Sequence, residues 1–212
     1  MPDVRLHYGA VCLTIRVLAR TLCGLRVSGR EHFPRPGPFI IAANHISVLD
    51  PPILGAVIPF ECTFFAKVEL FRNPLFGALI RSLNSIPVRR GEADREALTR
   101  ALAALRAGRP LVIFPEGTRD RAARLREPKP GLGFFAAQAG VPVVPTYISG
   151  TNRFRPALAR RPRISVVFGP AFAPPATPLD DPAARRAAYD EVGRAWSAAM
   201  RALEASHGVG GS

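Results

Sequence analysis

The chain has 212 residues, 48 % of them hydrophobic, which is enough for one domain with a core and at most a small appendage. Its formal net charge is +13, and 27 of its 29 basic residues are arginine because only Lys67 and Lys129 are lysines. A surface this basic attracts nucleic acid or anionic lipid. The sequence has no zinc-finger spacing, RNP-like aromatic strand or groove-binding basic helix. Anionic lipid is therefore the expected partner, whereas nucleic acid is not expected and stays a weak alternative.

Three cysteines, Cys12, Cys23 and Cys62, occur without CxxC spacing. This pattern argues against a disulfide framework and against a metal site, and is typical of reduced thiols in the cytosol. The N-terminal apolar run is interrupted by Arg16 and Arg20 and lacks a clear small-residue cleavage site, so a cleavable signal peptide is not expected.

Residues 4–27 predict a helix, because apolar side chains recur at steps of three and four residues. These side chains are Val4, Tyr8, Val11, Cys12, Ile15, Leu18, Ala19, Leu22 and Leu25. Arg5, Arg16 and Arg20 fall together on another face. No uncharged apolar stretch of about 20 residues exists, so a basic amphipathic helix in the membrane interface is favoured over a spanning helix. An ordinary helix packed on the core remains the alternative.

Beyond this helix, short apolar runs alternate with helical patterns. Strands are expected over residues 39–43, 62–66, 85–88, 111–114, 141–148 and 164–168, and helices over 51–58, 92–107, 131–139 and 182–205. Such alternation is typical of an α/β fold, here a single layered domain whose largely parallel central sheet is flanked by helices.

We expect three regions: an amphipathic membrane-interface helix over 1–30, the α/β core over 31–172, and a C-terminal helix with a frayed tail over 173–212. In sheets of this kind, functional sites gather where strands end and loops begin.

His45 and Asp50 are the strongest candidates for general-base chemistry. Their separation of five residues brings them together neither on a straight helix nor on a strand, but a tight strand-to-helix turn allows it. Asp50 precedes Pro51-Pro52, a pattern typical of a helix N-cap with proline at the first helical position. A neutral imidazole can accept a hydroxyl proton near pH 7, while a carboxylate fixes its tautomer. Taken alone, the pair is also compatible with a capping residue beside a loop histidine.

A second cluster follows the strand predicted over 111–114, in the segment Phe114-Pro115-Glu116-Gly117-Thr118-Arg119. Proline and glycine bracket Glu116, so the backbone is expected to turn sharply. Thr118, Arg119 and the nearby amides suit a phosphate, since arginine supplies a bidentate fork and Gly117 allows close backbone approach. The alternative is a solvated turn with a surface salt bridge.

Together, Asn44-His45 with Asp50 and the later FPEGTR segment resemble the glycerolipid acyltransferase family, which includes the 1-acyl-glycerol-3-phosphate acyltransferases. Further blocks resemble the same family: Lys67 to Leu70 with Pro74 and Gly77, Ile86 to Arg90, Lys129-Pro130-Gly131 and Val141 to Pro145. The chain departs from the family pattern at Asn84 and Arg89, where glycine and aspartate are usual.

The resemblance implies a glycerol-3-phosphate acyltransferase-like fold and roles for individual residues. His45 would be the general base, oriented by Asp50. Arg90 and Arg119 would hold the acceptor phosphate, with Arg89, Lys67, Thr118 and Gly117 as further contacts and Glu116 organising the acceptor or the arginines. Asn44, Pro115 and Lys129 complete the motifs.

The implied reaction moves a fatty acyl group from acyl-CoA or acyl carrier protein to the sn-2 hydroxyl of 1-acyl-glycerol-3-phosphate, giving phosphatidic acid without a metal or other cofactor. The expected location is the cytoplasmic side of the cell membrane, peripheral or monotopic. Two alternatives remain: another lyso-lipid acceptor, such as a lysophospholipid or lyso-ornithine lipid, and a non-catalytic basic protein that binds membrane or nucleic acid.

Overall fold

The structure is a computed structural model that describes residues 5–34, 37–89, 94–153, 164–176 and 180–208. Its α-helices are α1 (Leu6–Cys23), α2 (Asp50–Val57), α3 (Pro74–Ser82), α4 (Arg95–Arg106), α5 (Gly131–Ala139) and α6 (Pro182–Gly208). Its strands are β1 (Arg26–Ser28), β2 (Ile40–Ala43), β3 (Thr63–Lys67), β4 (Ser85–Val88), β5 (Leu111–Ile113), β6 (Val143–Ser149) and β7 (Ser165–Phe168). Short 3₁₀ turns cover Arg30–His32 (η1), Val68–Phe71 (η2) and Thr151–Arg153 (η3).

The strands form one seven-stranded sheet in the order β1-β7-β6-β2-β5-β3-β4. Every neighbouring pair is parallel except β6 and β7. All four residues of β2 are buried, as expected for a central parallel strand covered on both faces. The largely parallel α/β layer structure predicted from the sequence is confirmed.

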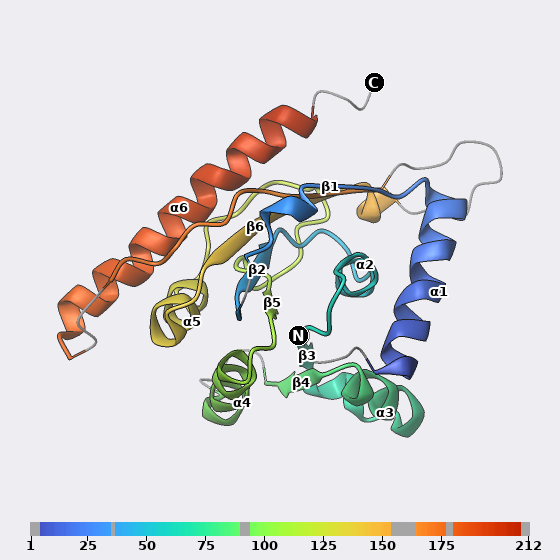
Figure 1. Cartoon of the computed structure of the whole chain (residues 1–212), viewed down its shortest axis with the longest axis horizontal. Helices are drawn as coiled ribbons and strands as arrows, with labels where there is room; N and C mark the ends of the chain where they lie inside the picture. The colour runs from blue at the N-terminus through green and yellow to red at the C-terminus, as the bar shows by residue number, and fades with distance from the viewer. Residues whose placement is uncertain (1–4, 35–36, 90–93, 154–163, 177–179, 209–212) are drawn as a thin grey trace.

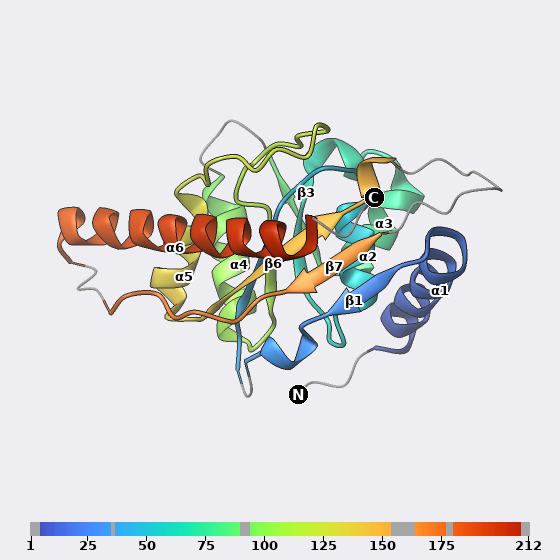
Figure 2. The same ribbon diagram turned by 90° about the horizontal axis from the view of Figure 1, so that it is seen from above.

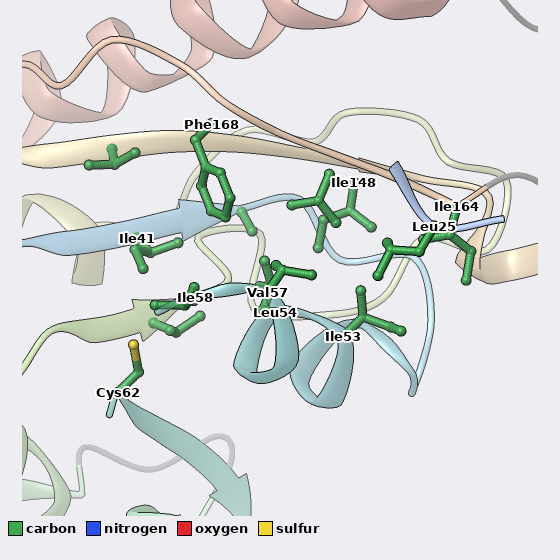
Figure 3. Packing of buried hydrophobic residues seen from close by; sticks show 14 of the residues in the cluster. Leu25, Ile41, Ile53, Leu54, Val57, Ile58, Cys62, Ile148, Ile164 and Phe168 are labelled. Carbon is green, nitrogen blue, oxygen red and sulfur yellow. The ribbon is translucent and has the colours of Figure 1, made fainter. Parts of the chain in front are cut away.

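Two apolar layers cover the sheet (Figure 1). On one face, β2 and β6 pack against α2, and α1 lies outside α2. Figure 3 shows part of this layer, in which Ile53, Leu54 and Val57 of α2 point toward the strands that carry Ile41, Ile148 and Phe168. On the other face, α4, α5 and α6 cover the strands, with α6 lying along α5 (Figure 2). The central strands are therefore buried on both faces, and the loops emerge at the two ends of the strands.

Helix α1 differs from its predicted pattern. Tyr8, Cys12 and Ala19 pack inward as expected, but Leu18 and Leu22 are exposed. Large apolar side chains on the solvent-facing side are Leu6, Leu13, Val17, Leu18 and Leu22. Apolar residues therefore occupy two sides of the helix, one packed on the protein and one uncovered.

The arginine face expected on α1 is also different, because it turns toward the protein. The Arg5 guanidinium donates hydrogen bonds to the Glu61 carboxylate and to Asn84 Oδ1, and Arg16 Nε donates to the carbonyl of Ala56 at 2.6 Å. Arg20 is exposed. Two of the three arginines thus fasten α1 to the domain.

Two short elements were not predicted. Helix α1 ends at Cys23 because Gly24 adopts a left-handed conformation with φ 60°, so residues 26–28 pair as β1 instead of extending the helix. Helix α3 begins after Asn73, whose side chain accepts from the Phe76 amide. Residues 92–93 of the predicted helix over 92–107, and residues 209–212 of the predicted tail, lie outside the described residues.

Candidate active site

The candidate site lies where neighbouring parallel strands end. Strands β2, β5 and β6 lie side by side in the same direction, so their carboxyl ends share one edge of the sheet. His45 follows β2, Glu116 follows β5 and Thr151 follows β6. Residues more than 70 positions apart in the chain therefore converge through topology.

His45 and Asp50 form the predicted pair. His45 Nδ1 and Asp50 Oδ2 lie 2.8 Å apart, and both residues are buried, with exposures of 6 % and 0 %. Because the carboxylate is the acceptor, Nδ1 is the nitrogen that carries hydrogen in this contact. The second ring nitrogen, Nε2, is then the basic one, and it has no hydrogen-bond partner among the described residues.

The Asp50 carboxylate does not act as the expected N-cap. Leu49 is the capping residue, and Asp50 is already the first residue of α2. Its Oδ2 accepts from the amides of Ile46 and Ser47, each at 2.7 Å, in the turn behind it. Its Oδ1 accepts from Thr151 Oγ1 at 2.6 Å. The carboxylate thus closes the turn and fixes the imidazole at the same time.

The imidazole also rests on an aromatic ring. The rings of His45 and Phe114 are stacked, with centroids 4.1 Å apart and planes 24° apart. The carbonyl of His45 accepts from the Asp120 amide at 2.9 Å, which ties the histidine to the loop after β5. Both contacts restrict movement of the ring, so its free nitrogen has a defined direction.

Glu116 is buried beside this pair without a close partner. It is 4 % exposed, and neither carboxyl oxygen has a hydrogen-bond partner among the described residues. Burial raises its pKa from 4.5 to about 7, opposed by the nearby His45 amide and Arg126 and reinforced by the Asp120 and Asp50 carboxylates. A carboxyl group with this pKa can hold or release a proton near neutral pH.

The turn after Glu116 depends on glycine. Gly117 has φ +71°, and a Cβ atom there would lie 2.9 Å from Cδ and Cε of Lys129. The amide of Lys129 donates to the carbonyl of buried Pro115 at 2.9 Å. Lys129, which the sequence placed in a separate block, therefore packs directly on the 115–117 turn.

Asn44 holds the end of β2 against β6. Its Nδ2 donates to the carbonyl of Ile148 at 2.9 Å, and its Oδ1 accepts from the Ile148 amide at 2.7 Å. The side chain thus continues the β2–β6 pairing beyond the last backbone contact. Its position next to His45 makes it a scaffold residue for the site.

The predicted phosphate-binding residues lie at the same edge and are more exposed. Lys67 ends β3, Arg89 follows β4, and Thr118 and Arg119 follow the 115–117 turn, all four exposed to solvent. Thr118 Oγ1 accepts from Arg126 at 3.0 Å. The structure does not bring Lys67 or Arg89 into contact with the His45 pair, and Arg90 lies outside the described residues.

Sequence reasoning missed two supports of the pair, Thr151 and the ring of Phe114. Neither gives a local signal, because the hydroxyl of Thr151 reaches Asp50 across 101 residues and Phe114 reads as an ordinary apolar strand residue. The parallel alignment of β2 with β5 and β6 supplies both contacts.

Comparisons with known proteins relate the chain to acyltransferases. A family model described as Acyltransferase matches residues 24–149. Lyso-ornithine lipid O-acyltransferase of Pseudomonas aeruginosa is 41 % identical over 126 residues, which cover 59 % of this chain and 47 % of that protein. The 1-acyl-sn-glycerol-3-phosphate acyltransferase of Borreliella burgdorferi is 34 % identical over 139 residues, covering 63 % of this chain and 55 % of that protein. The chain thus spans about half the length of these two relatives.

A solved structure gives the same result for the fold. The crystal structure of the 1-acyl-sn-glycerophosphate acyltransferase PlsC from Thermotoga maritima superposes with a TM-score of 0.66 at 28 % identity, covering 93 % of this chain and 83 % of that one. The family match spans the chain from β1 to β6 and includes both His45 and Glu116. The chain therefore belongs to the acyltransferase family.

Proposed function

We propose that the chain transfers a fatty acyl group from an acyl thioester to the free hydroxyl of a lyso-lipid, with 1-acyl-glycerol-3-phosphate as the acceptor. The observation that carries this proposal is the 2.8 Å contact between His45 Nδ1 and Asp50, which leaves Nε2 as a base at the loop edge of the sheet. A hydroxyl becomes a competent nucleophile when a base of this kind removes its proton during attack.

The proposed chemistry has two stages. His45 Nε2 takes the proton of the acceptor hydroxyl as its oxygen bonds to the thioester carbonyl carbon, giving a tetrahedral oxyanion. The carbonyl then re-forms, the carbon–sulfur bond breaks, and the thiolate receives the proton from the imidazolium. Asp50 stabilises that imidazolium through the Nδ1 hydrogen. Proton transfer and addition–elimination need neither a metal nor a redox cofactor.

The charges at the carboxyl ends of β3 and β4 support a phosphate-bearing acceptor. Arg89 and Arg100 line a cavity of about 150 Å³ at the end of β4 together with Asp94 and Glu96, and Lys67 ends the adjacent strand. Arg119 extends the positive charge on the other side, after β5. Guanidinium groups bind phosphate through paired hydrogen bonds, so Arg89, Arg90 and Arg119 are the proposed phosphate ligands, with Thr118 and Lys67 as further contacts.

A second acceptor has a specific observation in its favour. Among the relatives above, the lyso-ornithine lipid O-acyltransferase has the higher identity, 41 %. Its acceptor carries an amino-acid headgroup in place of a phosphate, so the arginines would contribute less to binding. The two acceptors are therefore separated by their dependence on Arg89 and Arg119.

Exposed apolar side chains support association with a membrane surface. Leu6 and Leu13 of α1 are 90 % and 57 % exposed, and Leu75 of α3 is 84 % exposed. Arg5 donates to the carbonyl of Ser82, which ties the start of α1 to the end of α3. Figure 1 shows the two helices adjacent at one side of the domain. Within the described residues, no helix is both long and apolar enough to cross a membrane. We propose peripheral association on the cytoplasmic side, with α1 and α3 in the lipid interface.

The experiment is a panel assay with purified chain, radiolabelled palmitoyl-CoA and three acceptors: 1-acyl-glycerol-3-phosphate, lysophosphatidylcholine and lyso-ornithine lipid. The proposal expects labelled phosphatidic acid as the main product and loss of acceptor affinity in Arg119→Ala. Preferred acylation of lyso-ornithine lipid, unaffected by Arg119→Ala, would establish the second acceptor instead. Absence of any acyl transfer would leave a basic membrane-binding protein.

A further inference from the structure

A second cavity lies apart from the His45 pair, between α6 and the loop that follows the FPEGTR segment. Its volume is about 400 Å³, within the range of about 300–1,000 Å³ typical of small-molecule sites. The lining residues are Ala123, Arg124, Leu125, Arg126 and Glu127 of the loop and Ser197, Arg201 and Glu204 of α6. His45 is not among them, so a ligand here would not be in contact with the catalytic imidazole.

Three arginines and two glutamates, Glu127 and Glu204, line this cavity, so its formal charge is positive by one unit, and two of the arginines form only long ion pairs. Arg201 meets Glu127 at 3.4 Å and Arg124 meets Asp120 at 3.6 Å, and both arginine side chains are more than 60 % exposed. Solvent-exposed ion pairs of this length contribute little free energy. The arginines can therefore turn to an anionic ligand without loss of a strong internal contact.

Ser197 supplies an independent indication of a ligand. It lines the cavity, is only 5 % exposed, and its hydroxyl has no hydrogen-bond partner among the described residues. Buried hydroxyl groups are normally hydrogen-bonded, and an unpaired one calls for an explanation. An anionic oxygen bound in the cavity would supply an acceptor for Ser197 Oγ.

The cavity is connected to the site through Thr118. Arg126 lines the cavity and donates to Thr118 Oγ1 at 3.0 Å, two residues after Glu116. The proposed acceptor phosphate lies at the other end of the site, near Arg89 after β4, whereas α6 packs on β6. The acceptor headgroup therefore leaves this arginine-lined cavity free for the other substrate.

We propose that the cavity between α6 and residues 123–127 binds the phosphorylated nucleotide end of a coenzyme A thioester. This proposal rests on the acyl transfer proposed above. Coenzyme A carries a pyrophosphate and a 3′-phosphate separated from its sulfur by the long pantetheine arm. Three arginines match that clustered charge, and the arm accounts for the separation from His45. The cavity thus selects the donor by its nucleotide rather than by its acyl chain.

The test measures binding and turnover separately. Calorimetry with adenosine 3′,5′-bisphosphate reports on the cavity alone and does not require catalysis. Arg201→Ala is expected to weaken this binding about tenfold, whereas Arg194→Ala, which removes the same charge from an exposed position of α6 outside the cavity, leaves it unchanged. Ser197→Ala is expected to weaken binding several-fold without lowering the melting temperature, because the lost hydroxyl has no hydrogen-bond partner within the part of the chain that the structure describes.

Kinetics should follow the same pattern. Arg201→Ala is expected to raise the KM for palmitoyl-CoA about tenfold, to leave the acceptor KM unchanged, and to leave the KM for S-palmitoyl-pantetheine unchanged. An equal rise in the KM for S-palmitoyl-pantetheine would overturn the proposal. Equally tight binding of inorganic phosphate and of the bisphosphate would also overturn it. So would acyl transfer from acyl carrier protein without any transfer from acyl-CoA. Bisphosphate binding without acyl transfer would contradict only the proposed function. Acyl transfer without bisphosphate binding would contradict only the cavity.

Discussion

Thr151 Oγ1 donates a 2.6 Å hydrogen bond to Asp50 Oδ1, which joins the end of β6 to the first turn of α2. Thr151 is 1 % exposed and Asp50 is fully buried. The bond occupies the carboxylate oxygen that does not face the imidazole. The orientation of His45 therefore depends on a residue from a third strand end as well as on the local turn.

Replacement of Thr151 tests this dependence. Thr151→Val removes the donor while keeping the branched shape, and a hydrogen bond to a charged group is worth about 1.5–3 kcal/mol. We expect kcat to fall about tenfold or more with little change in the acceptor KM. Thr151→Ser keeps the hydroxyl and should retain most of the activity. Equal activity of the valine and serine variants would show that the bond does not position the pair.

The raised pKa of Glu116 predicts that the stability of the folded chain depends on pH. Because its pKa is raised to about 7, the folded chain keeps a proton that the unfolded chain releases above pH 4.5. Stability is therefore lost as pH rises from about 4.5 to 7. Glu116→Gln, which stays neutral, should gain stability relative to wild type across this window, on the order of 3 kcal/mol. Urea unfolding of both proteins at pH 4.5, 6 and 8 measures this, and a constant difference would contradict the raised pKa.

The turn over residues 115–117 is expected to tolerate no side chain at position 117. Alanine there adopts φ +71° unfavourably and would press against Cδ and Cε of Lys129. We expect Gly117→Ala to cost about 1–2 kcal/mol of stability and to reduce kcat, because the turn carries Glu116. Thermal unfolding and initial rates test both effects. Gly108→Ala is the control, because Gly108 has φ +79° and open space around an added Cβ. This variant should lose stability through backbone strain and keep its activity.

The uncovered side of α1 predicts membrane binding through apolar contact. Leu13→Glu places a charge on that side, whereas Ala198→Glu adds the same charge to an exposed position of α6. Burial of a leucine is worth about 1.5–3 kcal/mol, so the Leu13 variant should bind anionic vesicles about 10- to 100-fold more weakly. Vesicle flotation should show no effect of Ala198→Glu. Equal binding by both variants would place the membrane surface elsewhere.

The local elements around the site followed from the sequence because their signals are local. The apolar run Ile40–Ala43, the prolines after Asp50 and the bracketed Glu116 each specify a strand end or a turn. Parallel strand order then accounts for the approach of His45 to the loop after β5. The contact between Lys129 and Gly117 was not predictable, since it depends on the path of the intervening loop.

Helix α1 shows why periodicity was insufficient elsewhere. An apolar step of three or four residues identifies a helix, but α1 has apolar residues on two sides. Periodicity cannot tell which side packs on the domain. The hydrogen bonds of Arg5 help to fix which side packs on the domain, and their acceptors, Glu61 and Asn84, lie far from Arg5 in the sequence. Asn84 itself has φ 61°, a left-handed conformation, where the resembled family usually has glycine.

The most direct test of the account is the rate of acyl transfer from palmitoyl-CoA to 1-acyl-glycerol-3-phosphate by wild type and His45→Ala, both shown by circular dichroism to be folded. We expect the variant to lose about 10²–10⁴-fold in kcat, because the base proposed to face the acceptor hydroxyl is gone. Wild-type activity in folded His45→Ala would contradict it.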